Sequence, residues 1–219
     1  MATERVSDLT FEVVDVRAER YAAVPTMIFR LRITEADARP IQSIVLRAQI
    51  QIEAQRRHYA TAEEGRLLEL FDVPARWGQT LKPILWTHAT ATVPTFEGVV
   101  EIDLPVTCTY DFEVTGAKYL HALDDGDIPL LFLFSGSVFA RTGTGFAVDQ
   151  VPWDRESTYR LPVRIWREMM DHYFPGGAWL RLRRESFDAL HRFKADRALP
   201  SWDAAVDALL ETATMREPV

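Results

Sequence analysis

The residue types that most often carry chemistry are sparse in this chain and lie far apart. The five histidines are His58, His88, His121, His172 and His191. None of them stands at the short spacings of metal-binding motifs, and the single cysteine, Cys108, forms no CxxC pair. Ligand spacing therefore gives no reason to expect a metal site, and we predict no cofactor.

The acidic loop from Asp124 to Asp127 resembles half of a calcium-binding loop. It lacks the alternating ligands and the distal glutamate that an EF-hand requires. Because aspartate and glycine are common in turns, we interpret it as a solvated turn with Gly126 in a left-handed conformation.

Two other segments contain residue types found at active sites. Ser135-Gly136-Ser137 lacks the outer glycines of a nucleophile elbow, so it predicts no hydrolase, and Gly136 suggests a β-bulge. Cys108 falls on the apolar side of a predicted strand, where a free cysteine usually acts as a small buried hydrophobe. We expect this thiol to be inert.

Catalytic groups are assembled by folding rather than by sequence position, so an enzyme or a small-molecule-binding protein is an alternative interpretation. Its site would be a cleft between the sheet and the C-terminal helices. The titratable residues to consider first are His58, His121, Asp124 and His172.

The C-terminal third concentrates the residue types that dominate protein interfaces. It holds four of the six tryptophans, and the segment 181–197 has six basic residues against three acidic ones. The predicted interaction residues are Trp153, Trp166, Trp179, Arg181, Arg183 and Arg184. The alternatives are tryptophans that fill a core and arginines on a solvated helix face.

Most of the chain around these residues alternates between apolar and polar side chains, which is the two-residue period of β-strands. From Ile44 to Ala54, apolar and polar side chains alternate, with Val45 as the one exception, which predicts a strand with a dry and a wet face. Met27 to Ile33 and Val106 to Val114 alternate in the same way. We predict a hairpin between the first two of these segments, with the third as a further neighbour.

Further strands are expected from their apolar and β-branched content at 11–16, 84–93, 98–104, 146–148 and 158–163. Pro129 to Ala140 is apolar at nearly every position, which is typical of a strand covered on both faces. We therefore place that strand at the centre of the core, facing the apolar side of Ile44 to Ala54.

Helical signals are confined to one insertion and the end of the chain. Thr61 and Glu64 fit a capping box before a short helix near 62–71. Helical spacing returns after residue 162, with Ser186 and Ser201 as predicted N-caps. Trp202, Ala205, Val206, Leu209 and Leu210 form an apolar stripe on the last helix.

This segregation predicts an α+β fold, predominantly antiparallel β with sandwich-like sheet packing and C-terminal helices. We expect a single domain over 1–219, with a β-rich part at 9–162 and a helical part at 163–214. No flexible linker composition separates the two parts.

The overall charge narrows the classes of partner. A formal charge of −7 argues against nucleic acid and against an anionic membrane surface. The longest apolar run is far shorter than the roughly 20 residues of a membrane-spanning helix, and no secretory signal precedes it. With a single cysteine, the sequence predicts a cytoplasmic protein.

Several segments together resemble an uncharacterised actinobacterial family that is known only as a domain of unknown function. They are FRLRI (29–33), RRHYA (56–60), LFDVPARW (70–77), FEGVVEIDLPV (96–106), DGDIPLLFLFSGSVF (125–139), VPWDRESTYRLPVRIWREMMD (151–171) and FPGGAWLRL (174–182). The resemblance spans nearly the whole chain, supports one domain and brings no catalytic residues. It also implies an association with gene neighbourhoods of nickel–iron uptake hydrogenases.

The sequence is rich in the apolar patterns that form a core and lacks a group of residues typical of catalysis. This favours a non-enzymatic accessory or interaction protein whose partner is another protein. The resemblance makes an assembly role in a hydrogenase-associated complex the specific hypothesis. The small-molecule-binding protein or enzyme with a cleft is the alternative.

Overall fold

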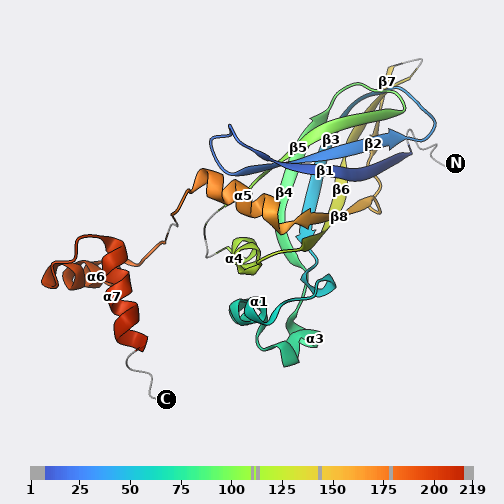
Figure 1. Cartoon of the computed structure of the whole chain (residues 1–219). Coiled ribbons are helices and arrows are strands. Elements are labelled where there is room, and N and C mark those ends of the chain that lie inside the picture. The colour runs from blue at the N-terminus through green and yellow to red at the C-terminus, as the bar shows by residue number, and fades with distance from the viewer. Residues whose placement is uncertain (1–7, 110, 112–113, 143–144, 178–179, 215–219) are drawn as a thin grey trace. The chain divides into compact units, whose positions relative to one another are not determined.

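The computed structural model describes residues 8–109, 111, 114–142, 145–177 and 180–214. Within these residues the fold is α+β, with antiparallel sheets packed as a sandwich, as predicted. The first sheet has the order β1-β2-β5, and the second has the order β4-β3-β6-β7, with β8 also paired to β6 (Figure 1). The strands are β1 (Leu9–Glu19), β2 (Thr26–Glu35), β3 (Ile41–Ile52), β4 (Ile84–Val93), β5 (Val99–Thr107), β6 (Asp127–Thr142), β7 (Gly145–Gln150) and β8 (Glu156–Pro162).

Aromatic side chains from the two sheets meet in the core between them. Phe11 of β1 stacks on Phe134 of β6 with ring centroids 4.6 Å apart. Phe29 of β2 meets Phe132 of β6 edge to face at 5.2 Å, and both side chains are fully buried. Offset and edge-to-face contacts of this kind add to the free energy gained by burying apolar area.

Strand β3 has the predicted dry and wet faces. Ile44, Leu46, Ala48 and Ile50 are fully buried, whereas Val45, the exception in the alternation, is 54% exposed. The predicted hairpin with β2 is wrong, because β3 pairs with β4 and β6, and β2 pairs with β1 and β5. The alternation defines the face of each residue but not the partner strand, so it did not distinguish between the two sheets.

Strand β6 lies at the centre of its sheet, but it is not covered on both faces. Phe132, Phe134 and Val138 are buried, whereas Leu131 and Leu133 are half-buried. It also pairs edge to edge with β3 rather than facing it, so the apolar side of β3 packs toward the other sheet. The register with β3 runs through Gly136 without a shift, so the predicted bulge is absent there. Glycine is required because φ is +149° and a Cβ would overlap the Val45 carbonyl oxygen.

The strand predicted from Val106 to Val114 ends at Thr107, and Tyr110, Phe112 and Glu113 of that prediction lie outside the described residues. The backbone N–H of Cys108 donates to the Pro25 carbonyl oxygen, and the N–H of Asp111 donates to Thr109 Oγ1 at 3.0 Å. Pro25 has no N–H to return the bond from Cys108, so the ladder between β2 and β5 ends there although the residue types alternate. The bond between Asp111 and Thr109 gives the following backbone a local alternative. Cys108 is buried, as expected.

A helical insertion joins β3 to β4 and lies at the end of the sandwich away from β7 (Figure 1). It comprises η1 (Ala54–Arg56), α1 (Thr61–Arg66), α2 (Leu68–Phe71), η2 (Pro74–Arg76) and α3 (Trp77–Thr80). The predicted helix at 62–71 is thus two short helices. The N-cap is Ala60, whose N–H donates to Glu63 Oε2 at 3.0 Å, one residue earlier than the predicted capping pair.

The remaining helices are α4 (Thr115–Ala122), α5 (Val163–Tyr173), α6 (Arg184–Asp196) and α7 (Trp202–Thr214). Ser201 caps α7 through a bond from the Ala204 N–H, as predicted. Ser186 lies inside α6, whose N-cap is Arg183, so that predicted cap is wrong. The chain divides into two compact units, Met1–Ala178 and Trp179–Val219, and α5 belongs to the first.

Candidate functional site

A buried ion pair fixes the acidic loop that follows α4. Arg57 Nη2 lies 2.7 Å from Glu63 Oε1, and their side chains are only 8% and 4% exposed. The same guanidinium donates to the backbone oxygens of Asp125 and Asp127. Glu63 also accepts the Asp124 N–H at 2.8 Å. Gly126 has the predicted left-handed φ, and residues 124–127 are all exposed, as expected of a solvated turn whose backbone these contacts fix.

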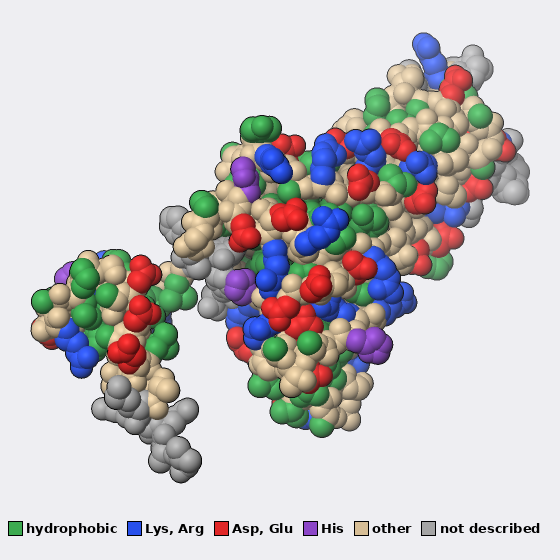
Figure 2. All heavy atoms as spheres, viewed as in Figure 1, with side chains coloured by type: hydrophobic (Ala, Val, Ile, Leu, Met, Phe, Trp, Pro, Cys, Tyr) green, Lys and Arg blue, Asp and Glu red, His purple; other side chains and the backbone are tan. Residues whose placement is uncertain are grey.

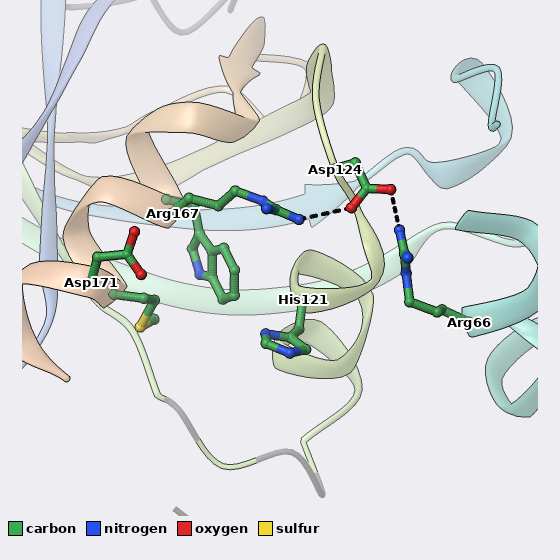
Figure 3. Close-up of a pocket in the computed structure, with 7 residues that line it drawn as sticks. Arg66, His121, Asp124, Arg167 and Asp171 are labelled. Atoms are coloured by element: carbon green, nitrogen blue, oxygen red, sulfur yellow. Dashed lines mark hydrogen bonds and ion pairs between the residues drawn. The ribbon is translucent and has the colours of Figure 1, made fainter. Parts of the chain in front are cut away.

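The carboxylate of Asp124 lies between two arginines from different helices (Figure 3). Arg66 of α1 pairs with one oxygen, and Arg167 of α5 lies 3.1 Å from the other. The hydrogen bond from Arg66 lowers the pKa of Asp124, and the charges of both arginines add to this effect. Each guanidinium also donates to a backbone oxygen, Arg66 to Ala122 and Arg167 to Leu123. The cluster therefore ties three helical segments together.

A cavity of about 330 Å³ opens beside this cluster. Its lining consists of Arg66, His121, Asp124, Trp166, Arg167, Met170 and Asp171. Burial lowers the pKa of His121, with smaller contributions from Arg167 and Arg66, which favours the neutral imidazole. Two arginines and two aspartates then balance in charge, which suits an uncharged or zwitterionic ligand better than an anion.

Trp166 adds one polar atom to this region. Its side chain is 4% exposed, and its indole Nε1 has no hydrogen-bond partner among the described residues. A buried N–H without a partner costs folding free energy.

The second unit presents a different kind of surface. On α7, Trp202 and Leu209 are each 41% exposed, Val206 is 42% exposed and Leu210 is 60% exposed. Ala205 is the only buried residue among those described in α6 and α7. Four of the five residues of the apolar stripe predicted from the sequence are therefore exposed, and Ala205 is buried.

Aromatic residues extend the stripe onto α6. The rings of Phe187 and Trp202 lie 5.3 Å apart, and Lys194 Nζ lies 5.6 Å from the centroid of Trp202. Hydrophobic and charged side chains are intermixed on the visible face of this unit (Figure 2). We name Trp202, Val206, Leu209 and Leu210 the α7 stripe.

A family model matches residues 6–218, nearly the full length of the chain. The chain belongs to the family of unknown function DUF6084. This agrees with the resemblance to a domain of unknown function. Membership in DUF6084 assigns no activity and no site residue, so function has to be argued from the geometry.

A search of curated proteins found no match. Among solved structures, β-glucosidase from Kluyveromyces marxianus aligns at 6% identity and a TM-score of 0.26, over 71% of this chain and 15% of the enzyme. The CARDB domain of PF1109 from Pyrococcus furiosus, in complex with di-metal ions, aligns at 11% identity and a TM-score of 0.25, over 71% and 92%. At these TM-scores, neither likeness bears on the fold or function of this DUF6084 protein.

Of the titratable residues selected from the sequence, His121 and Asp124 line one cavity. His58 lines a second cavity of about 540 Å³ that also includes Asp124. His172 is elsewhere, with its Nε2 donating to the Arg20 carbonyl oxygen at 3.0 Å. The sequence missed Arg66, Arg167 and Trp166 as members of this site, because only folding brings α1, α4 and α5 together.

The predicted interaction residues are divided between the two units. Trp153 is 92% exposed in the first unit, whereas Trp166 is buried there, which is the core-filling alternative for that residue. Arg181, Arg183 and Arg184 are exposed in the second unit. Trp179 lies outside the described residues.

The described residues also bear on metals and membranes. In the part of the chain that the structure describes, no three His, Cys, Asp or Glu side chains are grouped to hold a metal ion. No helix within the described ranges combines the length and the apolar character needed to cross a membrane.

Proposed function

We propose that this protein is a non-enzymatic accessory protein that binds another protein through the α6–α7 hairpin. The observation that carries the proposal is the exposed α7 stripe in a unit with a single buried residue among those described. A unit of about 40 residues buries too little surface to be stable without a staple or a partner. The exposed stripe is thus a surface that association would cover.

The composition of the stripe supports a role in recognition. Tryptophan and arginine are enriched among the residues that dominate binding energy, and both types occur in this unit. Trp202 is bordered by Lys194, and Phe193 is bordered by Arg197 at 4.4 Å. Such amphipathic anchors combine a large contact area with charge at the rim.

The candidate partner comes from the family resemblance, which associates such genes with nickel–iron hydrogenase neighbourhoods. We therefore propose that the partner is a component of a hydrogenase-associated complex and that this protein assists its assembly in the cytoplasm. The exposed α7 stripe supports a docking role, and the gene association supports the identity of the partner to be tested.

The experiment is affinity capture of the tagged full-length chain from the cells that produce it. The double variant Val206→Asp/Leu210→Asp places two charges on the stripe, and we expect it to lose the captured protein. The matched control is Val99→Asp/Val148→Asp, which changes two exposed valines of the first unit, 55% and 59% exposed. Equal capture by both variants, or no capture by the wild type, would contradict the proposal.

One observation favours a second candidate function, binding of a small uncharged or zwitterionic molecule beside Asp124. The cavity joins His121 and Asp124 with the side chains of Arg66, Arg167 and Trp166. A thermal-shift screen of amino acids and neutral metabolites tests it, with Asp171→Asn as the variant. Asp171 lines the cavity and forms no ion pair among the described residues, so this change should alter binding and leave the fold intact. A screen in which no compound shifts the wild-type protein would remove this candidate.

A further inference from the structure

We propose that the cavity beside Asp124 binds an ω-amino acid, a linear molecule with an ammonium group at one end and a carboxylate at the other. The inference rests on the second candidate function, because it names the ligand class of the same cavity. It is carried by the separation of charge between Asp171 and the two arginines that line this cavity.

The anionic end of the cavity is Asp171, which lacks the partner that its own helix offers. Arg167 stands one turn earlier on α5, and an arginine and an aspartate at this spacing commonly pair on a helix surface. The Arg167 side chain instead extends away from Asp171, and its Nη2 lies 3.1 Å from Asp124 Oδ1 (Figure 3). Asp171 is exposed, and its side chain forms no ion pair or hydrogen bond with any described residue. This carboxylate is therefore available to a cation.

The cationic end consists of Arg66 and Arg167, which share a single carboxylate. Both guanidiniums pair with Asp124, so one positive charge remains in excess at this end. Each guanidinium donates through Nε to a backbone oxygen and through Nη2 to Asp124, and neither Nη1 has a partner among the described residues. Both side chains are 43% exposed, so a ligand carboxylate would find charged N–H donors that the protein leaves unused.

The wall between the two ends carries no formal charge. His121 lies between Asp171 and Arg66 in Figure 3, and its lowered pKa favours the neutral imidazole. Its ring centroid lies 6.0 Å from that of Trp166, and Met170 follows Trp166 by one turn of α5. All three residues line the cavity. Such a wall suits a chain of methylene groups, because contact with it removes apolar surface from water.

The distance between the charged ends favours an ω-amino acid over an α-amino acid. One turn of α5 rises about 5.4 Å, and the Arg167 side chain extends still further from Asp171 (Figure 3). An α-amino acid has both charged groups attached to one carbon atom, so only one of them would reach its partner. A methylene chain allows the ammonium to contact Asp171 while the carboxylate contacts the arginines. The cavity volume of about 330 Å³ suits a ligand of this size.

The test is isothermal titration calorimetry of the full-length chain with δ-aminovalerate, valerate, pentylamine and glycine. Valerate lacks the ammonium group, pentylamine lacks the carboxylate, and glycine has both groups without the methylene chain between them. We expect δ-aminovalerate to bind about tenfold or more tightly than each of the others, because each of them leaves one charged end of the cavity without a partner.

Two substitutions alter the two ends separately. Asp171→Asn should weaken the binding of δ-aminovalerate about tenfold and leave that of valerate unchanged. Asp124→Asn removes the negative charge between the arginines, so valerate should bind about tenfold more tightly than it does to the wild type. Glu168→Gln is the matched control, because Glu168 is an exposed carboxylate of α5 that does not line the cavity. Circular dichroism verifies that each variant is folded.

Equal affinity for δ-aminovalerate and glycine would overturn the inference, and so would δ-aminovalerate binding that Asp171→Asn leaves unchanged. If none of the four probes binds, the ω-amino acid is refuted as well. The outcome is separable from that of the second candidate function, which survives when another neutral or zwitterionic compound shifts the melting temperature in the screen. The accessory role is tested by capture through the α7 stripe and does not depend on either result.

Discussion

The two units place similar residue types in opposite environments. In the first unit, Phe29 and Phe132 are completely buried between two sheets. In the second, Trp202 and Leu210 are 41% and 60% exposed on a helix with an equally regular apolar stripe. The difference shows that an amphipathic period determines which face is apolar but does not determine what covers that face.

The ion pairs of the two units also differ in how deeply they are buried. Arg57 and Glu63 are almost completely buried, and their polar atoms organise the Asp124 loop. Arg184 and Asp188 are 89% and 46% exposed, 3.5 Å apart on one helix. A buried pair becomes expensive to break because the remaining charge loses its partner, whereas an exposed pair is worth little.

The largest expected effect comes from breaking the buried pair. Glu63→Ala should lower the free energy of unfolding by about 3–5 kcal/mol, because Arg57 stays buried without its counter-charge. Urea denaturation of the full chain measures it. The control Asp188→Ala should change stability by less than about 0.5 kcal/mol. Similar losses for both variants would remove the contrast between the units.

The next largest loss of stability is expected from a substitution of Gly136. Gly136→Ala should lower the free energy of unfolding by about 2–4 kcal/mol, through overlap with the Val45 carbonyl oxygen and an unfavourable φ. At Gly177 an added Cβ would meet no atom within 4 Å, so Gly177→Ala is the matched control and should be nearly neutral. If Gly136→Ala unfolds at the wild-type urea concentration, the close approach of β3 and β6 is refuted.

The rate at which a thiol reacts reports how well its unit excludes a reagent, so it allows the two units to be compared. Burial raises the pKa of Cys108 to about 12, so it should react with a disulfide reagent at pH 8 about 100-fold or more slowly than an exposed thiol. The comparison is Cys108→Ala/Ala213→Cys, which places a thiol on exposed α7. Equal rates in the two proteins would show that the first unit opens freely.

The smallest effect concerns pH. The folded protein lowers the pKa of His121, so as pH falls below about 6.5 the unfolded chain takes up the proton first and stability declines. The urea midpoint should therefore fall between pH 7.5 and 5.5, and less steeply in His121→Gln. A variant whose midpoint falls as steeply as that of the wild type would show that His121 does not contribute.

Much of the fold could be predicted because β3 and α5 have strong periods and β4 is rich in β-branched residues. The α+β class and the cap at Ser201 followed from local pattern and chemistry. Pairing did not follow, because β2 and β3 have the same alternation but belong to different sheets. The end of β5 at Thr107 depended on hydrogen bonds that only the folded chain makes.

The candidate sites divide in the same way. His121 and Asp124 could be selected from the sequence as titratable residues, but Arg66 and Arg167 could not, because both guanidiniums converge on Asp124 only after folding. The α7 stripe was predicted as a helix face, yet its exposure depends on how few residues pack around it. Burial is a property of the whole unit, which a helical period does not contain.

Hydrogen exchange of the full chain tests the central claim most directly, because it reports on both units in one measurement. In dilute protein, we expect the amides of α7 to exchange much faster than those of β3 and β6. Adding the captured partner should slow α7 and leave β3 unchanged. Protection of α7 equal to that of β3 in the dilute chain would show that the stripe is already covered and would contradict the account.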